Sequence, residues 1–230
     1  MAPDRGINGQ NNFSLQALAI EFNLFPVRYM HSSWLKKDKH YKLIMSLKDN
    51  PETHLPLSEH LLKQFKLSND LDFDFEAKEK RVVLANMEEL SRLAFYLGII
   101  LHEETIRSVV LRKERVALEH VLGKEAYQFA VRKAQFISRA SRHAVPSLLI
   151  DWEHLDRFKH YLMTSGIQVI GCAFSRTPAA FQKRLAIKVP ADWRQALSSK
   201  GEIQLEPSQC AQLMVKTHKE VNRQWRNLLS

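Results

Sequence analysis

Three groups of residues in the 230-residue chain have side chains that metal or catalytic chemistry uses. The first is His102-Glu103-Glu104. A histidine followed by glutamate on a helix begins the zinc protease signature, which needs a second histidine four residues later so that both imidazoles face the metal. Ile106 occupies that position. The protease prediction therefore fails, and His102 is expected to be a hydrogen-bonded, partly buried side chain.

The second group alternates acidic and apolar residues from Asn69 to Glu76. This period of two predicts a short strand, or an extended segment whose aromatic side chains dock on the core. The spacing of the aspartates is similar to that of a calcium loop. However, the sixth position of such a loop lacks its glycine, and Arg81 stands where the twelfth position needs glutamate. A solvated acidic face is the better interpretation.

The third group is the pair Cys172 and Cys210, which lacks metal-binding spacing and predicts buried thiols in a reducing compartment. The sequence has no Walker loop, no dinucleotide glycine pattern and no Gly-x-Ser-x-Gly elbow. The histidines are scattered. We therefore predict no catalytic residue, no cofactor and no metal ligand, and do not expect an enzyme.

The element that must organise these residues is the stretch 87–111. Its apolar residues recur at spacings of three and four, and Asn86 with Glu89 has the pattern of a capping box. Gly98 interrupts the pattern, and residues 102–104 add polar side chains before the apolar face resumes. The stretch is predicted to form one kinked helix or two nearly continuous helices in the middle of the core.

Helical periodicity along the chain, with few glycines and prolines, predicts a mainly α protein. We expect one globular multi-helix domain over residues 13–230, with room for one or two short strands, after a flexible tail over residues 1–12. A long helix is predicted to start at Ser147 or Asp151 and to end at Gly166. The segment after it is a strand or a tightly packed helix. No secretory signal and no apolar run of membrane-spanning length is present.

Positive charge gathers in the second half of the chain. The net charge is +9, with −2 over residues 1–106 and +11 over residues 107–230. Such a surface favours an acidic partner, nucleic acid or an anionic membrane face. A helix predicted over residues 124–141 aligns Arg132, Arg139 and Arg142 in a basic stripe. A solvated face explains this stripe as well as a binding face does, and no known nucleic-acid-binding signature is present.

Three short patterns occur in order along the chain. They are Pro26-x-x-Tyr29-x-His31 near the N-terminus, Leu97-Gly98-x-x-Leu101-His102-x-x-x-Ile106-Arg107 in the central stretch, and Lys183-Arg184-Leu185 followed by Pro190. Together these patterns resemble the SctK (YscK/PscK/OrgA/MxiK) family of type III secretion proteins. Glu103 departs from the family pattern, because glycine stands there in a relative, and this puts the shape of the helix at that point in question.

The resemblance implies a non-enzymatic adaptor in the cytoplasmic sorting platform of a bacterial injectisome. In that family the adaptor links the inner-membrane ring protein SctD to the pod protein SctQ, below which the stator SctL and the ATPase SctN hang. The implied location is the bacterial cytoplasm, at the cytoplasmic face of the inner membrane. The motif residues are expected to be structural: Pro26, Tyr29, His31, Leu97, Gly98, His102 and Arg107.

An adaptor needs two contact faces and no active site. We predict that one face is electrostatic and is formed by Arg132, Arg139 and Arg142, with Lys219, Arg223 and Arg226 of the last helix. The other contact is expected to be more apolar, and its candidate anchors by residue type alone are Trp34, Trp193 and Trp225. The alternative is a nucleic-acid-binding regulator that uses the basic half, which a steeply salt-dependent affinity would reveal.

Overall fold

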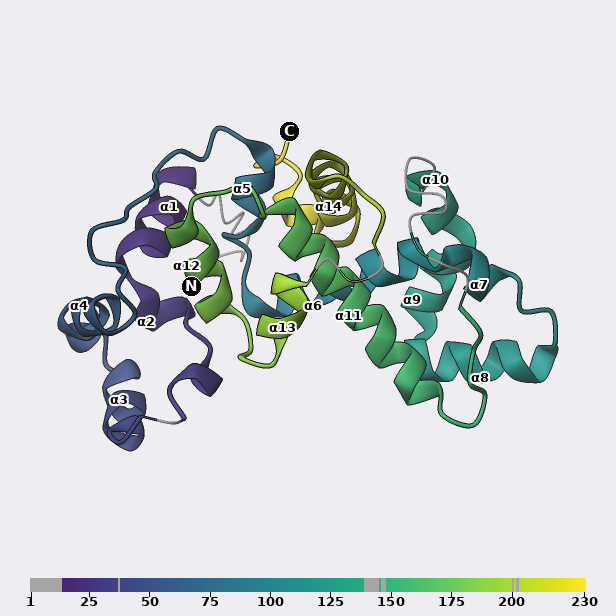
Figure 1. Ribbon diagram of the computed structural model, residues 1–230, viewed down its shortest axis with the longest axis horizontal. Coiled ribbons are helices and arrows are strands. Elements are labelled where there is room, and N and C mark those ends of the chain that lie inside the picture. The colour runs from purple at the N-terminus through teal and green to yellow at the C-terminus, as the bar shows by residue number, and fades with distance from the viewer. Residues whose placement is uncertain (1–13, 37, 139–144, 146–147, 200, 202) are drawn as a thin grey trace, which may run out of the picture.

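The computed structural model in Figure 1 describes residues 14–230 except 37, 139–144, 146–147, 200 and 202. The described residues form helices joined by loops and contain no strand, which confirms the prediction of a mainly α protein. The predicted flexible tail, residues 1–12, lies outside the described residues. Within the described part of the chain, every helix is too short or too polar to cross a bilayer.

Two long helices, α6 (Met87–Leu101) and α11 (Leu155–Ala173), cross at the centre of the molecule. The capping box predicted at the start of α6 is present. The side chain of Asn86 accepts a hydrogen bond from the Glu89 amide at 2.9 Å, and the Glu89 carboxylate accepts one from the Asn86 amide at 2.7 Å. These bonds satisfy amide groups that a helix N-terminus otherwise leaves without partners.

The helices cross at two glycines. A Cβ atom on Gly98 would overlap the carbonyl group of Leu162, and one on Gly166 would overlap the carbonyl group of Ala94. The two backbones therefore lie closer together than any larger side chains would allow. The prediction that Gly166 ends its helix is wrong: α11 runs through it to Ala173, because this glycine serves close packing and does not terminate the helix. The helix also starts later than predicted, at Leu155.

The stretch after α6 forms a second, short helix, α7 (Glu103–Arg107), and the backbone breaks at His102, where φ is −111° and ψ is 23°. The prediction of two nearly continuous helices is thus confirmed, although residues 109–111 are not helical. The buried carboxylate of Glu103 accepts hydrogen bonds from Arg107 at 3.0 Å and from the Ser138 hydroxyl at 3.2 Å. Glu103 therefore connects the break to the following helical layer.

That layer makes up one end of the molecule, on the right in Figure 1. It consists of α8 (Arg112–Leu122), α9 (Lys124–Phe129), the π-helical turn η3 (Ala130–Ala134) and α10 (Gln135–Ile137). Gly123 joins α8 to α9 with a φ of +88°, a conformation that favours glycine. Leu118, Leu122 and Phe129 are buried and belong to the central core.

The opposite end carries a second, smaller apolar cluster, in which Val27, Met30, Leu61 and Leu67 are buried. The elements of this end are α1 (Leu15–Leu24), α2 (Pro26–Tyr29), η1 (Ser32–Trp34), α3 (Tyr41–Lys48), η2 (Pro51–Thr53) and α4 (His54–Gln64). The buried apolar residues of α1, Ala19 and Phe22, belong to the central core. Helix α12 (Ala179–Lys188) contributes residues both to this cluster and to the central core. Helix α12 thereby connects the smaller cluster to the central core.

The segment of alternating acidic and apolar residues, 69–76, forms no strand. The backbone amide of Asp72 donates a hydrogen bond to the Asn23 side chain at 2.8 Å. This bond attaches the segment to α1 and is not part of a β-ladder. Phe75 docks in the core, whereas Leu71 and Phe73 are about half exposed. The strand prediction is therefore wrong, and docking holds for Phe75 alone. Helix α5 (Lys78–Val82) follows.

The C-terminal elements pack against the two long helices. They are α13 (Trp193–Ser198), α14 (Pro207–Val221) and η5 (Arg223–Trp225). In the view of Figure 1, α14 lies above the long helices and α13 lies below α6. Cys172 of α11 and Cys210 of α14 are free, buried thiols, as predicted.

Candidate functional site

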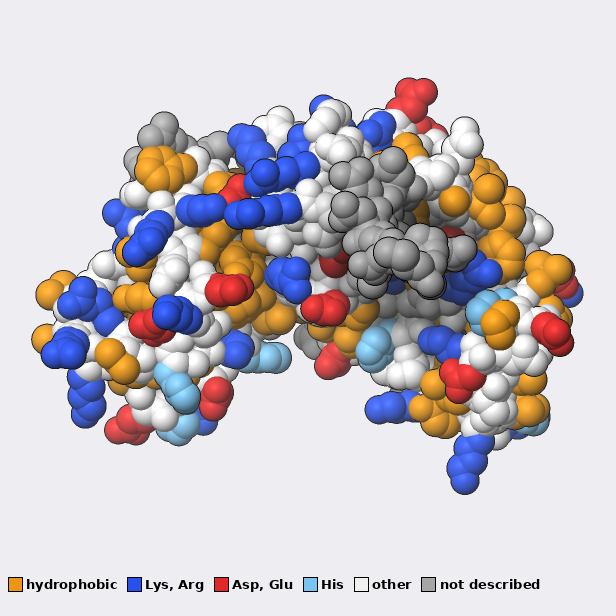
Figure 2. Space-filling view, turned by 180° about the vertical axis from the view of Figure 1, so that it is seen from behind, with side chains coloured by type: hydrophobic (Ala, Val, Ile, Leu, Met, Phe, Trp, Pro, Cys, Tyr) orange, Lys and Arg blue, Asp and Glu red, His pale blue; other side chains and the backbone are white. Residues whose placement is uncertain are grey.

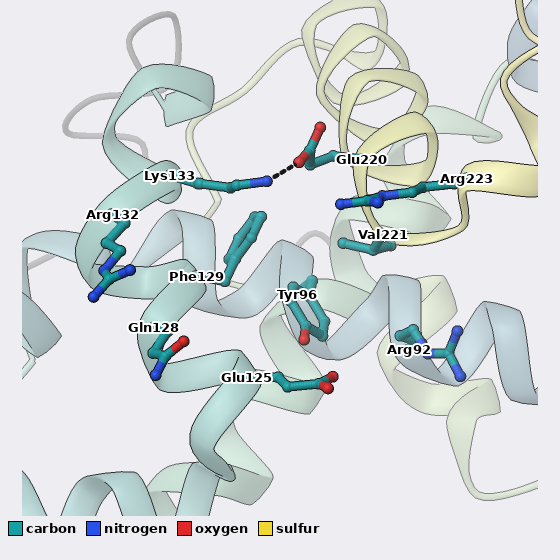
Figure 3. Close-up of a pocket in the computed structure, with 10 residues that line it drawn as sticks. All are labelled: Arg92, Tyr96, Glu125, Gln128, Phe129, Arg132, Lys133, Glu220, Val221 and Arg223. Carbon is teal, nitrogen blue, oxygen red and sulfur yellow. Dashed lines mark hydrogen bonds and ion pairs between the residues drawn. The ribbon is translucent and has the colours of Figure 1, made fainter.

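A groove of about 540 Å³ opens between α6, the run α9–η3 and the end of α14 (Figure 3). On its floor the rings of Tyr96 and Phe129 meet edge to face, with centroids 4.8 Å apart. This is a favourable geometry for aromatic pairs. Charged side chains line the groove around these rings. It therefore combines an apolar floor with a charged rim.

The rim has more cations than carboxylates. Six charged side chains line the groove: Arg92, Glu125, Arg132, Lys133, Glu220 and Arg223. Lys133 forms an ion pair with Glu220, and Arg92 pairs at 3.0 Å with Glu88, on its own helix. Arg132 and Arg223 are exposed, and neither side chain has a hydrogen-bond or ion-pair partner among the residues that the structure describes. Two guanidinium groups are thus available to a carboxylate from outside.

The π-helical turn sets the direction of the basic residues on one side of the groove. Such a turn shifts the following residues relative to α-helical spacing, and π turns are frequent at functional sites. Figure 3 shows Lys133 reaching across the groove to Glu220, while Arg132 projects from its outer edge. The uniform α-helical spacing on which the predicted stripe rests therefore does not hold over residues 130–134.

A buried network holds the turn that carries Arg223. The carboxylate of Glu89, only 8% exposed, accepts hydrogen bonds from the Trp225 indole at 2.9 Å and from the Gln224 amide at 2.6 Å. The side chain of Asn222 donates to the backbone carbonyl of Glu89 at 3.2 Å. These bonds attach the end of α14 to the first turn of α6. They keep Arg223 at the groove edge.

The structure brings together only part of the predicted electrostatic face. Arg132 and Arg223, about ninety residues apart in the sequence, line the same groove. Arg226 lies next to it, because its guanidinium contacts Glu220 at 3.4 Å and donates to the carbonyl of Lys219 at 2.9 Å. Arg139 and Arg142 lie outside the described residues.

Sequence reasoning missed eight of the ten residues that line the groove, among them Arg92, Tyr96, Phe129 and Lys133. Periodicity assigned the aromatic residues no special role, since they resemble ordinary core positions. Lys133 could not be found, because the π turn that directs it has no signature in the sequence. Arg92 and Tyr96 come from α6, whereas Phe129 and Lys133 come from the run α9–η3, and only the tertiary fold makes the two pairs neighbours.

The three tryptophans proposed as apolar anchors are engaged within the fold. The Trp225 side chain is 3% exposed. The indole of Trp34 donates to the carbonyl of Val189 at 2.8 Å, and Trp193 packs against the central core. Among the described residues the groove floor offers an aromatic surface in their place.

The first sequence pattern lies beside α12, the helix that carries Lys183-Arg184-Leu185 of the third pattern. Pro26 occupies the first position of α2, and the Tyr29 hydroxyl donates to the carbonyl of Phe22 at 2.8 Å. The backbone amide of His31 donates to the carbonyl of Ile187 at 2.9 Å. These contacts place the motif residues in the packing between α2 and α12.

The second pattern lies at the crossing of α6 and α11. Leu97 is fully buried next to Gly98, and His102 is 2% exposed, with its Nε2 atom 3.4 Å from the Ser165 hydroxyl. Arg107 lies at the end of α7, where it pairs with Glu103. Glu103, the residue that departs from the family pattern, therefore stabilises the backbone break at His102 through this ion pair.

The buried histidines predict a loss of stability in acid. Burial lowers the pKa of His102 from 6.5 to about 4, and it lowers the pKa of His218 to about 4 against the opposing effect of Glu89. Between about pH 4 and pH 6.5 the unfolded chain therefore binds more protons than the folded chain. The free energy of unfolding is therefore highest above pH 6.5 and falls by roughly 3 kcal/mol per histidine as the pH drops to 4.

Urea unfolding at pH 7 and pH 5 measures this effect. The variant His102→Gln is expected to show a weaker pH dependence than the wild-type protein, whereas His160→Gln, at an exposed position of α11, should leave it unchanged. Equal slopes for the wild-type protein and His102→Gln would contradict the assignment. His102→Ala should likewise lower the stability before it lowers partner affinity.

The described residues contain no cluster of three or more His, Cys, Asp or Glu side chains that could hold a metal ion. His102 has Ser165 and the ring of Tyr161 as neighbours, with the two ring centroids 5.1 Å apart. The acidic segment uses its carboxylates on its own chain, since Asp72 and Asp74 both pair with Lys80, at 3.0 and 3.3 Å. The groove is therefore the strongest candidate site.

Comparisons with known proteins identify the family. The family model described as YOP proteins translocation protein K (YscK) matches residues 17–230. No curated relative matches significantly. A solved structure, the cytoplasmic domain of the type III secretion sorting platform protein PscK from P. aeruginosa, matches with a TM-score of 0.55 and 22% identity, over 88% of this chain and 94% of that chain. At that identity the match shows a shared fold. Because the family model spans nearly the whole chain, including all three sequence patterns, the protein belongs to the YscK (SctK) family.

Proposed function

We propose that the protein is a non-enzymatic adaptor of the type III secretion sorting platform. It links the inner-membrane ring protein SctD to the pod protein SctQ, and through SctQ to the stator SctL and the ATPase SctN. It works in the bacterial cytoplasm at the face of the inner membrane. Membership of the YscK family supports this role. The basic groove supports a location for one of the contacts. Its two exposed arginines have side chains that lack partners among the described residues.

The groove contributes an electrostatic contact to one partner. Each exposed ion pair adds only about 0–1 kcal/mol to affinity, so Arg132 and Arg223 mainly steer association and select an acidic surface. The aromatic floor supplies apolar area that excludes water from those pairs, as the centres of protein interfaces do. The partner segment that fits this groove therefore has carboxylates on both sides of an apolar side chain.

Charge reversal tests the groove. The double variant Arg132→Glu/Arg223→Glu is expected to lower affinity for one of the two partners, SctQ or SctD, by roughly tenfold or more, because attraction becomes repulsion at both edges. Titrations at several salt concentrations measure the change. The control is Lys63→Glu/Lys183→Glu, which alters net charge equally at exposed positions of α4 and α12. Unchanged affinity for both partners in the groove variant would refute the electrostatic contact.

The competing function is nucleic-acid binding by the same cations. Co-purification of the full chain with SctQ and SctD, in the presence of bulk nucleic acid as competitor, separates the two. Retention of both proteins supports the adaptor. Their loss, with nucleic acid in the bound fraction and an affinity that falls steeply with salt, would establish the regulator in its place.

A further inference from the structure

The loop between α7 and α8 places apolar side chains at the end of the molecule. In Figure 1 this loop is the outermost point of the long axis on the right. Val110 is 79% exposed and Leu111 is 62% exposed, and Val116, one turn into α8, is 59% exposed. Residues on either side are anchored, because Ile106 and Leu118 are buried in the core. The loop therefore presents its apolar side chains outward from a fixed base.

Cations lie beside these side chains. Arg112, Lys113 and Arg115 are exposed on the first turn of α8, and no ion pair joins any of them to a described residue. Glu114 in the same turn is partly buried, and Glu104 on α7 is exposed, so positive charge prevails around the loop. Figure 2 shows the same end from behind, at the left, with apolar and basic side chains adjacent.

We propose that this end, defined by Val110, Leu111, Arg112, Lys113, Arg115 and Val116 and called the apolar tip, docks on an anionic phospholipid bilayer. A projecting tip can enter the surface of a bilayer without a shape-matched partner opposite it. Apolar side chains that enter the boundary between headgroups and acyl chains leave water, and the adjacent cations meet lipid phosphates. Charge complementarity therefore selects an anionic bilayer.

The proposal is independent of the adaptor role and of the basic groove, which opens between α6, α9 and α14. The bilayer contact would hold the protein at a membrane while the groove stays accessible. Each cation near an anionic surface raises partitioning by roughly fivefold, so three cations and three apolar side chains together suffice for reversible binding.

Vesicle sedimentation of the full chain tests the proposal. The wild-type protein is expected to bind vesicles of mixed phosphatidylglycerol and phosphatidylcholine, to release them at high salt, and not to bind phosphatidylcholine alone. Val110→Ser/Leu111→Ser and Arg112→Gln/Lys113→Gln/Arg115→Gln should each weaken binding at least tenfold. The control Leu43→Ser/Leu55→Ser removes two other exposed apolar side chains, 57% and 56% exposed, from α3 and α4 and should bind as the wild type does.

A fluorescent label reports insertion directly. Leu111→Cys can be labelled selectively with a nitrobenzoxadiazole probe, because Cys172 and Cys210 are buried. Its emission should shift to the blue and rise on vesicles that contain phosphatidylglycerol, and the same label at Leu55→Cys should not respond. Circular dichroism verifies that each variant is folded.

Several results would overturn the proposal. One is the absence of binding dependent on anionic lipid, and another is binding that the tip variants keep while Arg132→Glu/Arg223→Glu loses it, since the groove would then be the lipid contact. A third is a combined result: the wild-type protein does not bind vesicles, and the Val110→Ser/Leu111→Ser variant loses binding to SctD or SctQ. That outcome would make the tip a protein interface.

Discussion

Replacing Gly166 with alanine is expected to unfold the protein or to lower its free energy of unfolding by more than about 4 kcal/mol. The added methyl group would overlap the backbone carbonyl of Ala94, which cannot rotate away as the end of a flexible side chain could. The helices α6 and α11 would have to separate, and the central core would lose its packing along both of them. Gly98→Ala should behave alike, because its methyl group would overlap the carbonyl of Leu162.

Urea unfolding followed by circular dichroism measures the loss. Gly123→Ala is the matched comparison, since a Cβ atom there meets nothing within 4 Å and only the positive φ opposes it. That strain costs about 1–3 kcal/mol. If Gly166→Ala were no less stable than Gly123→Ala, the close approach of the two helices would be wrong.

Substitution of Arg184 is expected to cause the second large loss of stability. Its side chain is fully buried, and its guanidinium donates to the carbonyl of Leu67 at 2.9 Å, to that of Asp70, and to that of Asn23 at 3.4 Å. Arg184→Met would leave these carbonyl groups without their donor, at a cost of about 3–5 kcal/mol. Lysine should not restore stability, because a single ammonium cannot reproduce the planar, forked geometry.

Amide hydrogen exchange locates the damage. In Arg184→Met, protection is expected to fall first around residues 67–70, because the guanidinium ties the carbonyls of Leu67 and Asp70 to α12. Lys183→Met alters the neighbouring, exposed cation of the same sequence pattern and should change stability by less than about 0.5 kcal/mol. Equal stabilities for the two variants would show that the buried guanidinium contributes nothing.

The candidate groove was only partly predictable. Arg132 and Arg223 were expected to act on one face because both were predicted on exposed sides of basic helices. The structure places Arg132 in the π turn and Arg223 in η5, yet both line one groove. Their common position depends on the π turn and on the hydrogen bonds that Glu89 receives from Gln224 and Trp225. The π turn is an irregular feature and these hydrogen bonds join residues far apart in the sequence, so local periodicity cannot predict either.

Local chemistry was sufficient for the helical class, for the capping box that begins α6, and for the break near His102, since each depends on residues close together in the sequence. The family resemblance likewise needed only short patterns. Packing decided the rest. Gly98 and Gly166 look like an interruption and a helix end in the sequence, yet each admits the backbone of the other helix. The meaning of a glycine depends on what lies opposite it, and that neighbour exists only once the chain has folded.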